Sequence, residues 1–274
     1  MRMQIKTWWE YQNARVSGVE KNVPWWVNDK LKLHKFLVDN NIPTPNLYEV
    51  WKQPEEIELN SLPTEFVLKP SVMHSAAGVC VFRKVAENKF HDQLRQRTMN
   101  IEGIIKEQKE IYNKCKFKSA YRIFAEEKIY DSQLPKEKIP LDYKVFCFYG
   151  IPKMVFQFDR NVTPKAAAWF DGGFDELDMN NIQSDWKFIS KGVAMLPIHH
   201  MEMLSIAARV SSLLKTPFIS VDMYESTRGP VVGELTPAPG GPYYKKMYEF
   251  SQNYDIELGK AWERAEQRIS AELS

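Results

Sequence analysis

The stretch FVLKPSVMHSAAGVCVFR, residues 66–83, contains two short apolar segments separated by a run of small and polar residues. FVLKP and VCVFR have the length and composition of strands, and SVMHSAAG (71–78) between them predicts a hairpin with a mobile loop. Lys69, at a strand end beside this loop, can lie over a polyphosphate, because lysine neutralises charge and small side chains let backbone N–H groups approach. The alternative is a surface lysine on an edge hairpin.

Further along the chain, DYKVFCFYG (142–150) and PKMVFQFDR (152–160) predict two strands joined by a Gly-Ile-Pro turn. AAAWFD (166–171) predicts a third strand. Side chains alternate between the faces of a strand, so Asp142 and Lys144 share one face. A second lysine in a cleft would also suit a phosphate, and an ordinary surface ion pair is the alternative.

Each of the last two predicted strands, FISVDMY (218–224) and PVVGELT (230–236), carries a carboxylate. Asp222 or Glu234 would cost several kcal/mol if it lost water on so apolar a strand without a partner. Two carboxylates on adjacent antiparallel strands form a cation site. Hard oxygen ligands bridged to phosphates by water suit Mg²⁺ better than zinc. A structural salt bridge to arginine or lysine is the alternative.

The remaining segments complete an α+β pattern. Helices are predicted at 28–41, 87–99, 199–214 and about 254–273. The segment 121–130 predicts another strand, 131–141 contains two prolines and predicts a hinge, and 171–198 predicts a long loop, a feature that is often functional. Hairpins dominate over repeated βαβ units, which indicates the α+β class.

Length and composition are those of an ordinary globular protein. A chain of 274 residues with 44% hydrophobic residues buries a sizeable core without disulfide or metal staples, and the formal net charge of +2 gives no argument for a nucleic-acid partner. Three scattered cysteines predict reduced thiols. The first residues lack the apolar run of a signal peptide, and no stretch is apolar enough to span a membrane. The expected compartment is therefore the cytoplasm.

The common nucleotide and hydrolase motifs are missing from the sequence: it contains no P-loop, no G-x-S-x-G, no H-E-x-x-H, and no G-x-G-x-x-G after the first strand. Residues 106–118 carry five lysines and are interpreted as a solvated surface, with contact to an anionic substrate as the alternative. Trp169, Phe170 and Trp186 either stack on a sugar or pack in a core.

The order of these features resembles the ATP-grasp proteins of teichuronopeptide biosynthesis, the TupA-like family. The resemblance rests on FVLKPSVMHSAAG, Glu126-Glu127, DYKVFCFYGIPKMV, VDMY and GELTPAPGG, and runs from about Asp29 to Gly259. It implies an ATP-grasp fold in which two α+β lobes sandwich the nucleotide, with a short N-terminal helical extension. The implied segments are 1–60 for this extension and a partial pre-grasp segment, 61–135 for the small lobe, and 136–274 for the large lobe with the metal site.

The resemblance assigns the following residues of the small lobe to ATP. Lys30 would lie near the triphosphate and Lys69 at the α- and β-phosphates. The loop would fold over the phosphates through Ser71, His74, Ser75 and Gly78. Glu126 and Glu127, with the backbone of Lys128 and Ile129, would form the hinge that reads adenine, and one of the two carboxylates would reach the ribose.

In the large lobe the resemblance implies catalytic roles for two cations. Lys144 would face the phosphate tail, and Arg160 would face the γ-phosphate or the developing acyl phosphate. Asp222 and Glu234 would hold Mg²⁺. Many ATP-grasp enzymes have asparagine two residues after the last metal glutamate, whereas this chain has Thr236, whose hydroxyl is a weaker ligand. The number of Mg²⁺ ions therefore stays open.

Three functions are compatible with these features. The resemblance implies an ATP-dependent carboxylate–amine ligase that acts through an acyl phosphate in cell-envelope polysaccharide biosynthesis, on a small-molecule or saccharide carboxylate and an amine. A kinase of a sugar or small acceptor is the second function, and a glycosyltransferase or sugar-nucleotide-binding module is the third. The acceptor site would draw on 171–198, the turn 237–244 and the N-terminal tryptophans Trp8, Trp9, Trp25 and Trp26. The sequence leaves the substrates and the oligomeric state open.

Overall fold

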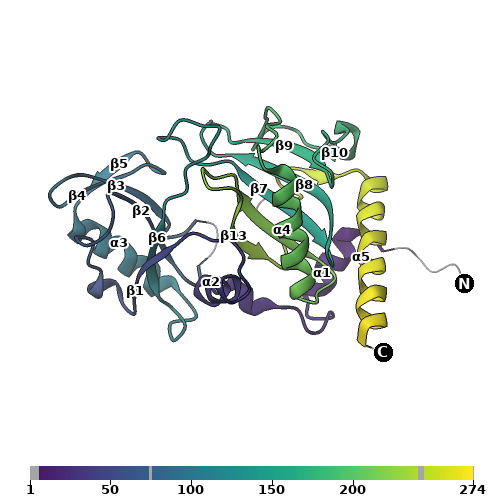
Figure 1. Cartoon of the computed structure of the whole chain (residues 1–274), viewed down its shortest axis with the longest axis horizontal. Helices are drawn as coiled ribbons and strands as arrows, with labels where there is room; N and C mark the ends of the chain where they lie inside the picture. Colours follow the sequence, from purple (N-terminus) through teal and green to yellow (C-terminus); the bar gives the residue numbers. More distant parts are fainter. Residues whose placement is uncertain (1–5, 74–75, 240–243, 274) are drawn as a thin grey trace, which may run out of the picture. The chain divides into compact units, whose positions relative to one another are not determined.

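The computed structural model describes residues 6–73, 76–239 and 244–273, which form two compact units (Figure 1). Unit 1 combines the residues up to Val27, Asp131–Leu134 and the chain from Pro140 onwards. Unit 2 combines Asn28–Tyr130 and Pro135–Ile139. The division differs from the three consecutive segments expected from the sequence, because the expected extension 1–60 is shared between the two units.

Unit 2 is built on a six-stranded antiparallel sheet in the order β1-β6-β2-β3-β4-β5. The strands are β1 (Leu47–Trp51), β2 (Glu65–Pro70), β3 (Cys80–Ala86), β4 (Lys89–Asp92), β5 (Arg97–Met99) and β6 (Ile123–Glu127). Helices α2 (Lys30–Asp39) and α3 (Ile101–Lys114) and the short helix η2 (Pro54–Glu56) complete the unit. The predicted hairpin of β2 and β3 and the predicted strand within 121–130 are confirmed.

The core of unit 2 lies on the face of the sheet covered by α3. Burial alternates along β2, so Phe66 and Leu68 point inward, as a half-buried strand requires. They pack with Phe82 of β3 and Ile104 of α3. This alternation explains why FVLKP is recognisable as a strand from its sequence.

The helix predicted at 87–99 is wrong. The segment forms β4 and β5, with turns at Asn88 and Gln96, whose φ angles of 49° and 52° are left-handed and incompatible with an α-helix. The helix instead begins at Ile101 and is capped by the Asn100 side chain. It was not predicted because its lysines were interpreted only as a charged surface. All five lysines of 106–118 are exposed, which confirms the solvated surface.

Unit 1 is built on a second six-stranded sheet, in the order β11-β9-β8-β7-β12-β13. Its strands are β7 (Asp142–Phe148), β8 (Ile151–Asp159), β9 (Ala166–Asp171), β11 (Ser190–Lys191), β12 (Ile219–Tyr224) and β13 (Val231–Thr236). Only β11 pairs in parallel. A two-stranded ribbon of β10 (Ile182–Gln183) and β14 (Glu249–Phe250) lies outside this sheet, and η3 (Met179–Asn181) precedes β10.

Three helices complete unit 1: α1 (Trp8–Val16), α4 (His200–Leu213) and α5 (Gln252–Leu273). The predicted helices at 199–214 and 254–273 are confirmed to within two residues. Helix α4 packs on β7, β8 and β12, whereas α1 packs on α5 (Figure 1). The aromatic core between the sheet and these two helices contains Trp8, Phe146, Phe218 and Trp262. The short helix η1 (Trp25–Asn28) connects the first residues to unit 2.

This core contains aromatic residues that the sequence assigned either to a core or to an acceptor site. Trp8 is fully buried, and Trp169 and Phe170 are each 2% exposed, so the three rings belong to the core. Trp186 reaches the surface and touches Trp169 edge-on. Among the described helices, none is both long and apolar enough to cross a bilayer.

Candidate active site

A cluster of charged side chains lies across three neighbouring strands of unit 1. Lys144 of β7 is the register partner of Asp222 of β12, which in turn is the partner of Glu234 of β13. Side chains directly opposite on adjacent strands share a face. The three predicted residues therefore meet in one row, and Lys144 Nζ hydrogen-bonds Asp222 Oδ2.

Asp142 completes the cluster at the start of β7. Its Oδ2 lies 2.9 Å from Lys144 Nζ and 2.7 Å from the Arg160 guanidinium. Asp142 thereby brings the two predicted catalytic cations together, although Arg160 follows the end of β8. The hydroxyl of buried Ser220 donates to Asp222 Oδ1 at 2.9 Å and orients that carboxylate.

The pKa values in the cluster follow from burial and mutual charge. Burial alone would lower the pKa of Lys144, but Asp142 and Asp222 raise it above the ordinary value. Burial would raise the pKa of Asp142, yet Lys144 and Arg160 hold it below the usual range. Burial raises the pKa of Asp222 to about 6 against the pull of Lys144, and the charges of Asp142 and Glu234 add to the rise. Asp142 and Asp222 share Lys144, and Asp142 also reaches Arg160.

The donor set of this cluster fits Mg²⁺. Magnesium is usually held by one or two carboxylates, with water and substrate phosphates in the remaining positions, and Asp222 and Glu234 supply such a pair. Thr236, the third predicted ligand, ends β13 opposite Ser220. Within the described ranges, no three His, Cys, Asp or Glu side chains converge as a metal centre, so the protein alone does not offer a closed site of the zinc type.

The strand that carries Glu234 has a local irregularity at Gly233. The register between β12 and β13 shifts between Asp222 and Met223, which leaves Gly233 as an extra residue. A Cβ at Gly233 would lie 2.5 Å from Cε2 of Tyr224. Glycine therefore lets the Tyr224 ring pack over the bulge that aims Glu234.

In unit 2 the structure brings Lys69 and Glu126 together. The Lys69 ammonium lies 2.5 Å from Glu126 Oε1, and both side chains are nearly buried. The two come from the neighbouring strands β2 and β6, two residues apart in register. The predicted phosphate lysine and one predicted hinge carboxylate are thus direct partners.

The loop after β2 is held at its start. Lys30 donates its backbone N–H to Ser71 O and its ammonium to Met73 O, at 2.9 and 2.7 Å. The buried Ser71 hydroxyl accepts from the backbone of Arg122. Lys30 and Ser71 therefore shape the loop. The predicted contacts His74 and Ser75 lie outside the described residues.

Beyond β6, the segment expected to read adenine is fixed by Glu65. This carboxylate accepts from Lys128 Nζ at 2.9 Å and from the Tyr130 hydroxyl. Burial by itself would raise the pKa of Glu65, but these hydrogen bonds outweigh it and hold the pKa below its usual value. Glu127 accepts from the backbone and side chain of Asn46, and Ile129 is buried. The predicted residues thus fall into two groups, one in each unit.

Residues 11–263 match the family model described as TupA-like ATPgrasp. The chain belongs to the TupA-like ATP-grasp family. This match covers most of the chain and confirms the resemblance, the α+β class and the ATP-grasp fold. Membership in an ATP-grasp family indicates an ATP-dependent enzyme. No curated protein matches the sequence.

Solved structures similar to this TupA-like protein are ATP-grasp ligases at low identity. D-alanine–D-alanine ligase from Bacillus anthracis is 15% identical, with a TM-score of 0.50, and the match covers 90% of this chain and 69% of the ligase. D-cycloserine synthetase DcsG is 14% identical, with a TM-score of 0.50 and coverage of 93% and 78%. These likenesses show the fold.

A third structure is that of the ATP-grasp ligase PsnB complexed with precursor peptide PsnA2 and AMPPNP. It is 12% identical, with a TM-score of 0.45, and the match covers 89% of this chain. The TupA-like chain spans 60% of the length of PsnB.

Several residues that shape the site were not predicted from the sequence. Asp142 was noted only as sharing a face with Lys144, and Ser220 and Glu65 carried no signal. Glu65 depends on partners far along the chain, such as Tyr130, which follows 65 residues later, whereas Ser220 acts on Asp222, two residues away. The only local signal was the alternation D-Y-K at the start of β7.

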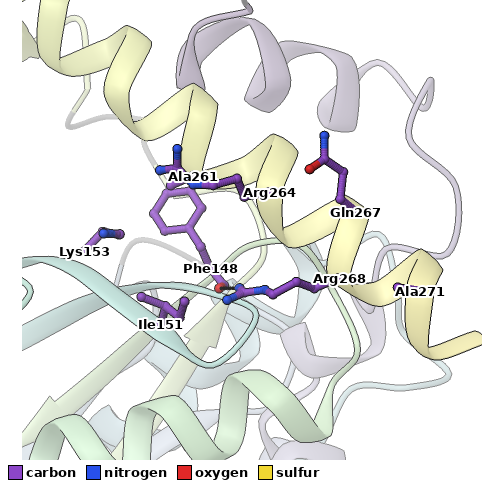
Figure 2. A pocket seen from close by; sticks show the side chains of 8 residues that line it. All are labelled: Phe148, Ile151, Lys153, Ala261, Arg264, Gln267, Arg268 and Ala271. Atoms are coloured by element: carbon purple, nitrogen blue, oxygen red, sulfur yellow. Dashed lines mark hydrogen bonds between the residues drawn. The ribbon is translucent and has the colours of Figure 1, made fainter.

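Two cavities in unit 1 have linings that contain no residue of the charge cluster. One, of about 370 Å³, lies between α5 and the β7–β8 hairpin (Figure 2). Figure 2 shows Arg268 reaching from α5 to the hairpin, where it donates to the carbonyls of Phe148 and Tyr149. The other, of about 750 Å³, is lined by residues between Met179 and Lys191, including Trp186. It falls in the segment expected to contact the acceptor.

Proposed function

We propose that this TupA-like protein is an ATP-dependent carboxylate–amine ligase that acts through an acyl phosphate in cell-envelope polysaccharide biosynthesis. The observation that carries the proposal is the row formed by Lys144, Asp222 and Glu234, with Arg160 joined to it through Asp142. Cations and metal-ligating carboxylates on one face are what phosphoryl transfer requires.

The reaction would need little covalent chemistry from the protein. A substrate carboxylate oxygen attacks the γ-phosphorus of ATP and ADP leaves; the amine then attacks the acyl carbon and inorganic phosphate leaves. When bound, Mg²⁺ would neutralise charge on the phosphates. Lys144 and Arg160 would stabilise charge that develops on the transferred group. Asp142 would orient both cations, since it already contacts both.

In unit 2, Lys69 would neutralise part of the phosphate charge. Glu126 holds its ammonium in one position, so less side-chain entropy is lost when a phosphate binds. The backbone of Lys128 and Ile129 would bind adenine. Glu65 holds the Lys128 side chain and so fixes the conformation of the main chain at 128–129.

The test of this function is a release assay for ADP. The protein would be incubated with ATP, Mg²⁺, a panel of uronic acids and a panel of amino acids, singly and in combination. A ligase releases more than one ADP per enzyme molecule only when a carboxylate and an amine are both present, and the amide product then appears in equal amount. The Asp222→Asn variant is the inactive control.

The other outcomes overturn the proposal. ADP release with a saccharide alone, together with a stable phosphate ester, would identify a kinase. A melting temperature raised by uridine-diphosphate sugars and unchanged by ATP with Mg²⁺ would identify a sugar-nucleotide protein. ADP release with no dependence on either acceptor would exclude the ligase reaction for these substrates.

A further inference from the structure

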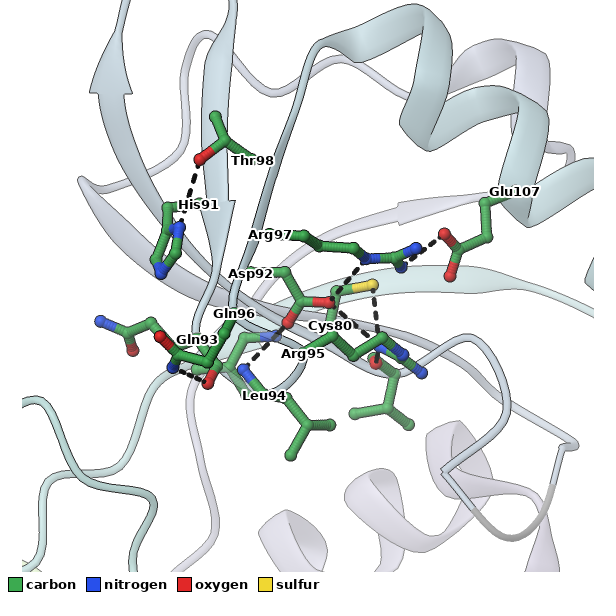
Figure 3. A network of polar contacts seen from close by, with 12 residues as sticks. Cys80, His91, Asp92, Gln93, Leu94, Arg95, Gln96, Arg97, Thr98 and Glu107 are labelled. Carbon is green, nitrogen blue, oxygen red and sulfur yellow. Dashed lines mark hydrogen bonds and ion pairs between the residues drawn. The ribbon is translucent and has the colours of Figure 1, made fainter. Parts of the chain in front are cut away.

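The turn between β4 and β5 contains a buried carboxylate that two arginines share. Asp92 is fully buried, and its Oδ2 lies 3.1 Å from Arg95 and 3.6 Å from Arg97. Figure 3 shows both guanidinium groups reaching this carboxylate. The other oxygen, Oδ1, accepts from the backbone of Val81 and Leu94 at 3.3 and 3.1 Å. Asp92 is thus fully hydrogen-bonded.

The two arginines differ in what else they contact. Arg97 turns to α3, where it pairs with Glu107 at 2.5 Å. Arg95 turns to the end of the loop between β2 and β3. It donates to Ala76 O at 3.2 Å and to Val79 O, and its Nη1 lies 3.6 Å from Cys80 Sγ. One carboxylate therefore anchors a contact to the helix and a separate contact to the loop.

The segment from Ala76 to Val79, here named the loop stem, has a backbone that needs support. Ala76 has a φ of +57° and Gly78 of +74°, both in the left-handed region. For alanine this conformation is unfavourable by roughly 1 kcal/mol or more. The stem closes a turn through Val79 N to Ala76 O, and Gln108 of α3 donates to Gly78 O at 2.9 Å. Arg95 and Gln108 therefore hold the carbonyls of three stem residues, Ala76, Gly78 and Val79, in place.

Arg95 donates a hydrogen bond to Asp92 Oδ2 at 3.1 Å, but it is not the only group that compensates this carboxylate. That carboxylate already accepts two backbone N–H groups and has Arg97 as a cation, and the Arg95 side chain is 32% exposed, so it fills little of the core. Its distinctive contacts are those to the stem. Backbone N–H groups in turns with left-handed residues form anion-binding concavities, which suits a loop expected to contact phosphates.

We propose that Arg95 is a positioning residue for the nucleotide: held by Asp92, it fixes the carbonyls of Ala76 and Val79 and so presets the loop stem for the phosphates. This inference rests on the proposed ATP-dependent function. It gives a role to the turn at 92–96, which also contacts Glu65 through the side chain of Gln93 at 2.9 Å. One turn thus touches both the loop stem and the carboxylate that fixes Lys128.

The test compares Arg95→Gln with Arg97→Gln, which removes an arginine from the same carboxylate without touching the stem. Calorimetry with the ATP analogue AMPPNP and Mg²⁺ gives the dissociation constant. We expect Arg95→Gln to raise it about tenfold, Arg95→Lys to recover part of the loss, and Arg97→Gln to stay within about twofold. In steady-state assays Arg95→Gln should raise KM for ATP more than it lowers kcat.

A second readout needs no nucleotide. Amide hydrogen exchange at Gly78 and Val79 should accelerate in Arg95→Gln and not in Arg97→Gln. Equal exchange and equal affinity in the two variants would overturn the role of Arg95. A wild-type protein that fails to bind AMPPNP would instead overturn the proposed function, even if the exchange result identified Arg95 as the support of the stem.

Discussion

At the residue scale, substitutions in the charge cluster of unit 1 have different effects on stability and activity, depending on whether they remove a positive or a negative charge. Asp142 and Asp222 are buried and share Lys144, so removing the lysine takes from Asp222 its contact with Lys144 and leaves Asp142 paired with Arg160. Replacing a carboxylate by its amide leaves the lysine with one carboxylate and preserves most hydrogen bonds. The two kinds of variant therefore separate stability from chemistry.

Asp222→Asn and Glu234→Gln should each abolish ATP turnover and leave the protein folded. The amide of residue 222 can still accept from Ser220, whereas its affinity for a cation is lost. By comparison with single electrostatic stabilisers, the rate should fall by about 10²–10³, or ~2.7–4 kcal/mol. ADP release measures the rate, and circular dichroism checks the fold. Near wild-type turnover in both variants would rule out the metal assignment.

Lys144→Ala should lower the free energy of unfolding by about 3 kcal/mol, because a buried ion pair loses one partner. Lys69→Ala should weaken ATP binding by roughly 10–100-fold, the size of a charged hydrogen bond. Lys114→Ala, which removes an exposed lysine of α3, is the matched control for both. Chemical denaturation and calorimetry give the two quantities. Identical values for all three variants would remove Lys69 and Lys144 from the site.

At the element scale, the bulge in β13 positions Glu234, and it depends on a glycine. Gly233→Ala should lower the free energy of unfolding by about 1–3 kcal/mol, because the added methyl group meets the Tyr224 ring at 2.5 Å. Turnover should fall as well, since the neighbouring Glu234 would move. Gly173→Ala, whose added Cβ would come no closer than 3.4 Å to Asp171, is the control. A Gly233→Ala protein of unchanged stability and turnover would show that the bulge tolerates a side chain.

The start of α4 carries a pH-sensitive contact. His199, at the helix N-cap, contacts buried Glu225 at 2.7 Å. This hydrogen bond, together with the charges of Glu225 and Glu202, raises the pKa of His199 against the opposing effect of burial. A raised pKa in the folded state means that protonation stabilises the fold. The stabilisation by protonated His199 is fully present below pH 6.5, the ordinary pKa of histidine, and is lost as the pH rises through the raised pKa.

His199→Gln should therefore lower the melting temperature more at pH 5.5 than at pH 8.5. His200→Gln, whose ring contacts the carbonyl of Pro197 and no carboxylate, is the control. Scanning calorimetry at the two pH values measures the difference. A His199→Gln effect of equal size at both would mean that the charge of His199 contributes nothing to folding.

The elements that the sequence predicts are those with a local signature. Short apolar runs bounded by turn residues identified β2, β7, β8 and β9, and the amphipathic pattern identified α4. The helix predicted at 87–99 was wrong because the segment has few hydrophobic residues to set a period. Its conformation depends on the contacts of Asp92 with Arg95 and Arg97, which the sequence pattern does not show. Asp222 and Glu234 were predictable as a pair because they lie on adjacent strands. The contact of Asp142 with Arg160 was not predictable, because it joins the start of β7 to the residue after β8.

At the scale of the whole molecule, the two units differ in how the chain builds them. The core of unit 2 draws on residues between Trp51 and Ala125, a single stretch. The core of unit 1 combines Trp8 with residues up to Ala265. Arg15 of α1 is fully buried and donates to the carbonyls of Phe218 and Pro237, at the ends of the strands that carry Asp222 and Glu234. The first helix thus supports the charge cluster.

A fragment of residues 28–139 should fold by itself, since it contains the whole sheet and core of unit 2. It should show a cooperative thermal transition by circular dichroism. In the full chain, Trp8→Ala should lower the free energy of unfolding of unit 1 by about 3–5 kcal/mol, because a large buried ring is lost. Exchange protection in unit 2 should be unaffected by this variant. A fragment without a cooperative transition would show that unit 2 needs unit 1.

The packing of α1 against α5 also sets the order in which the protein can be completed on the ribosome. The backbone of Trp9 donates to the Asp255 side chain, a partner 246 residues later. At 5–20 residues per second, α1 waits roughly 12–50 s for that partner to be synthesised. Unit 2 emerges entirely within this interval and can fold first. During translation the side chains that α1 buries in the folded protein, Trp8 among them, therefore remain without their native cover until α5 has left the exit tunnel.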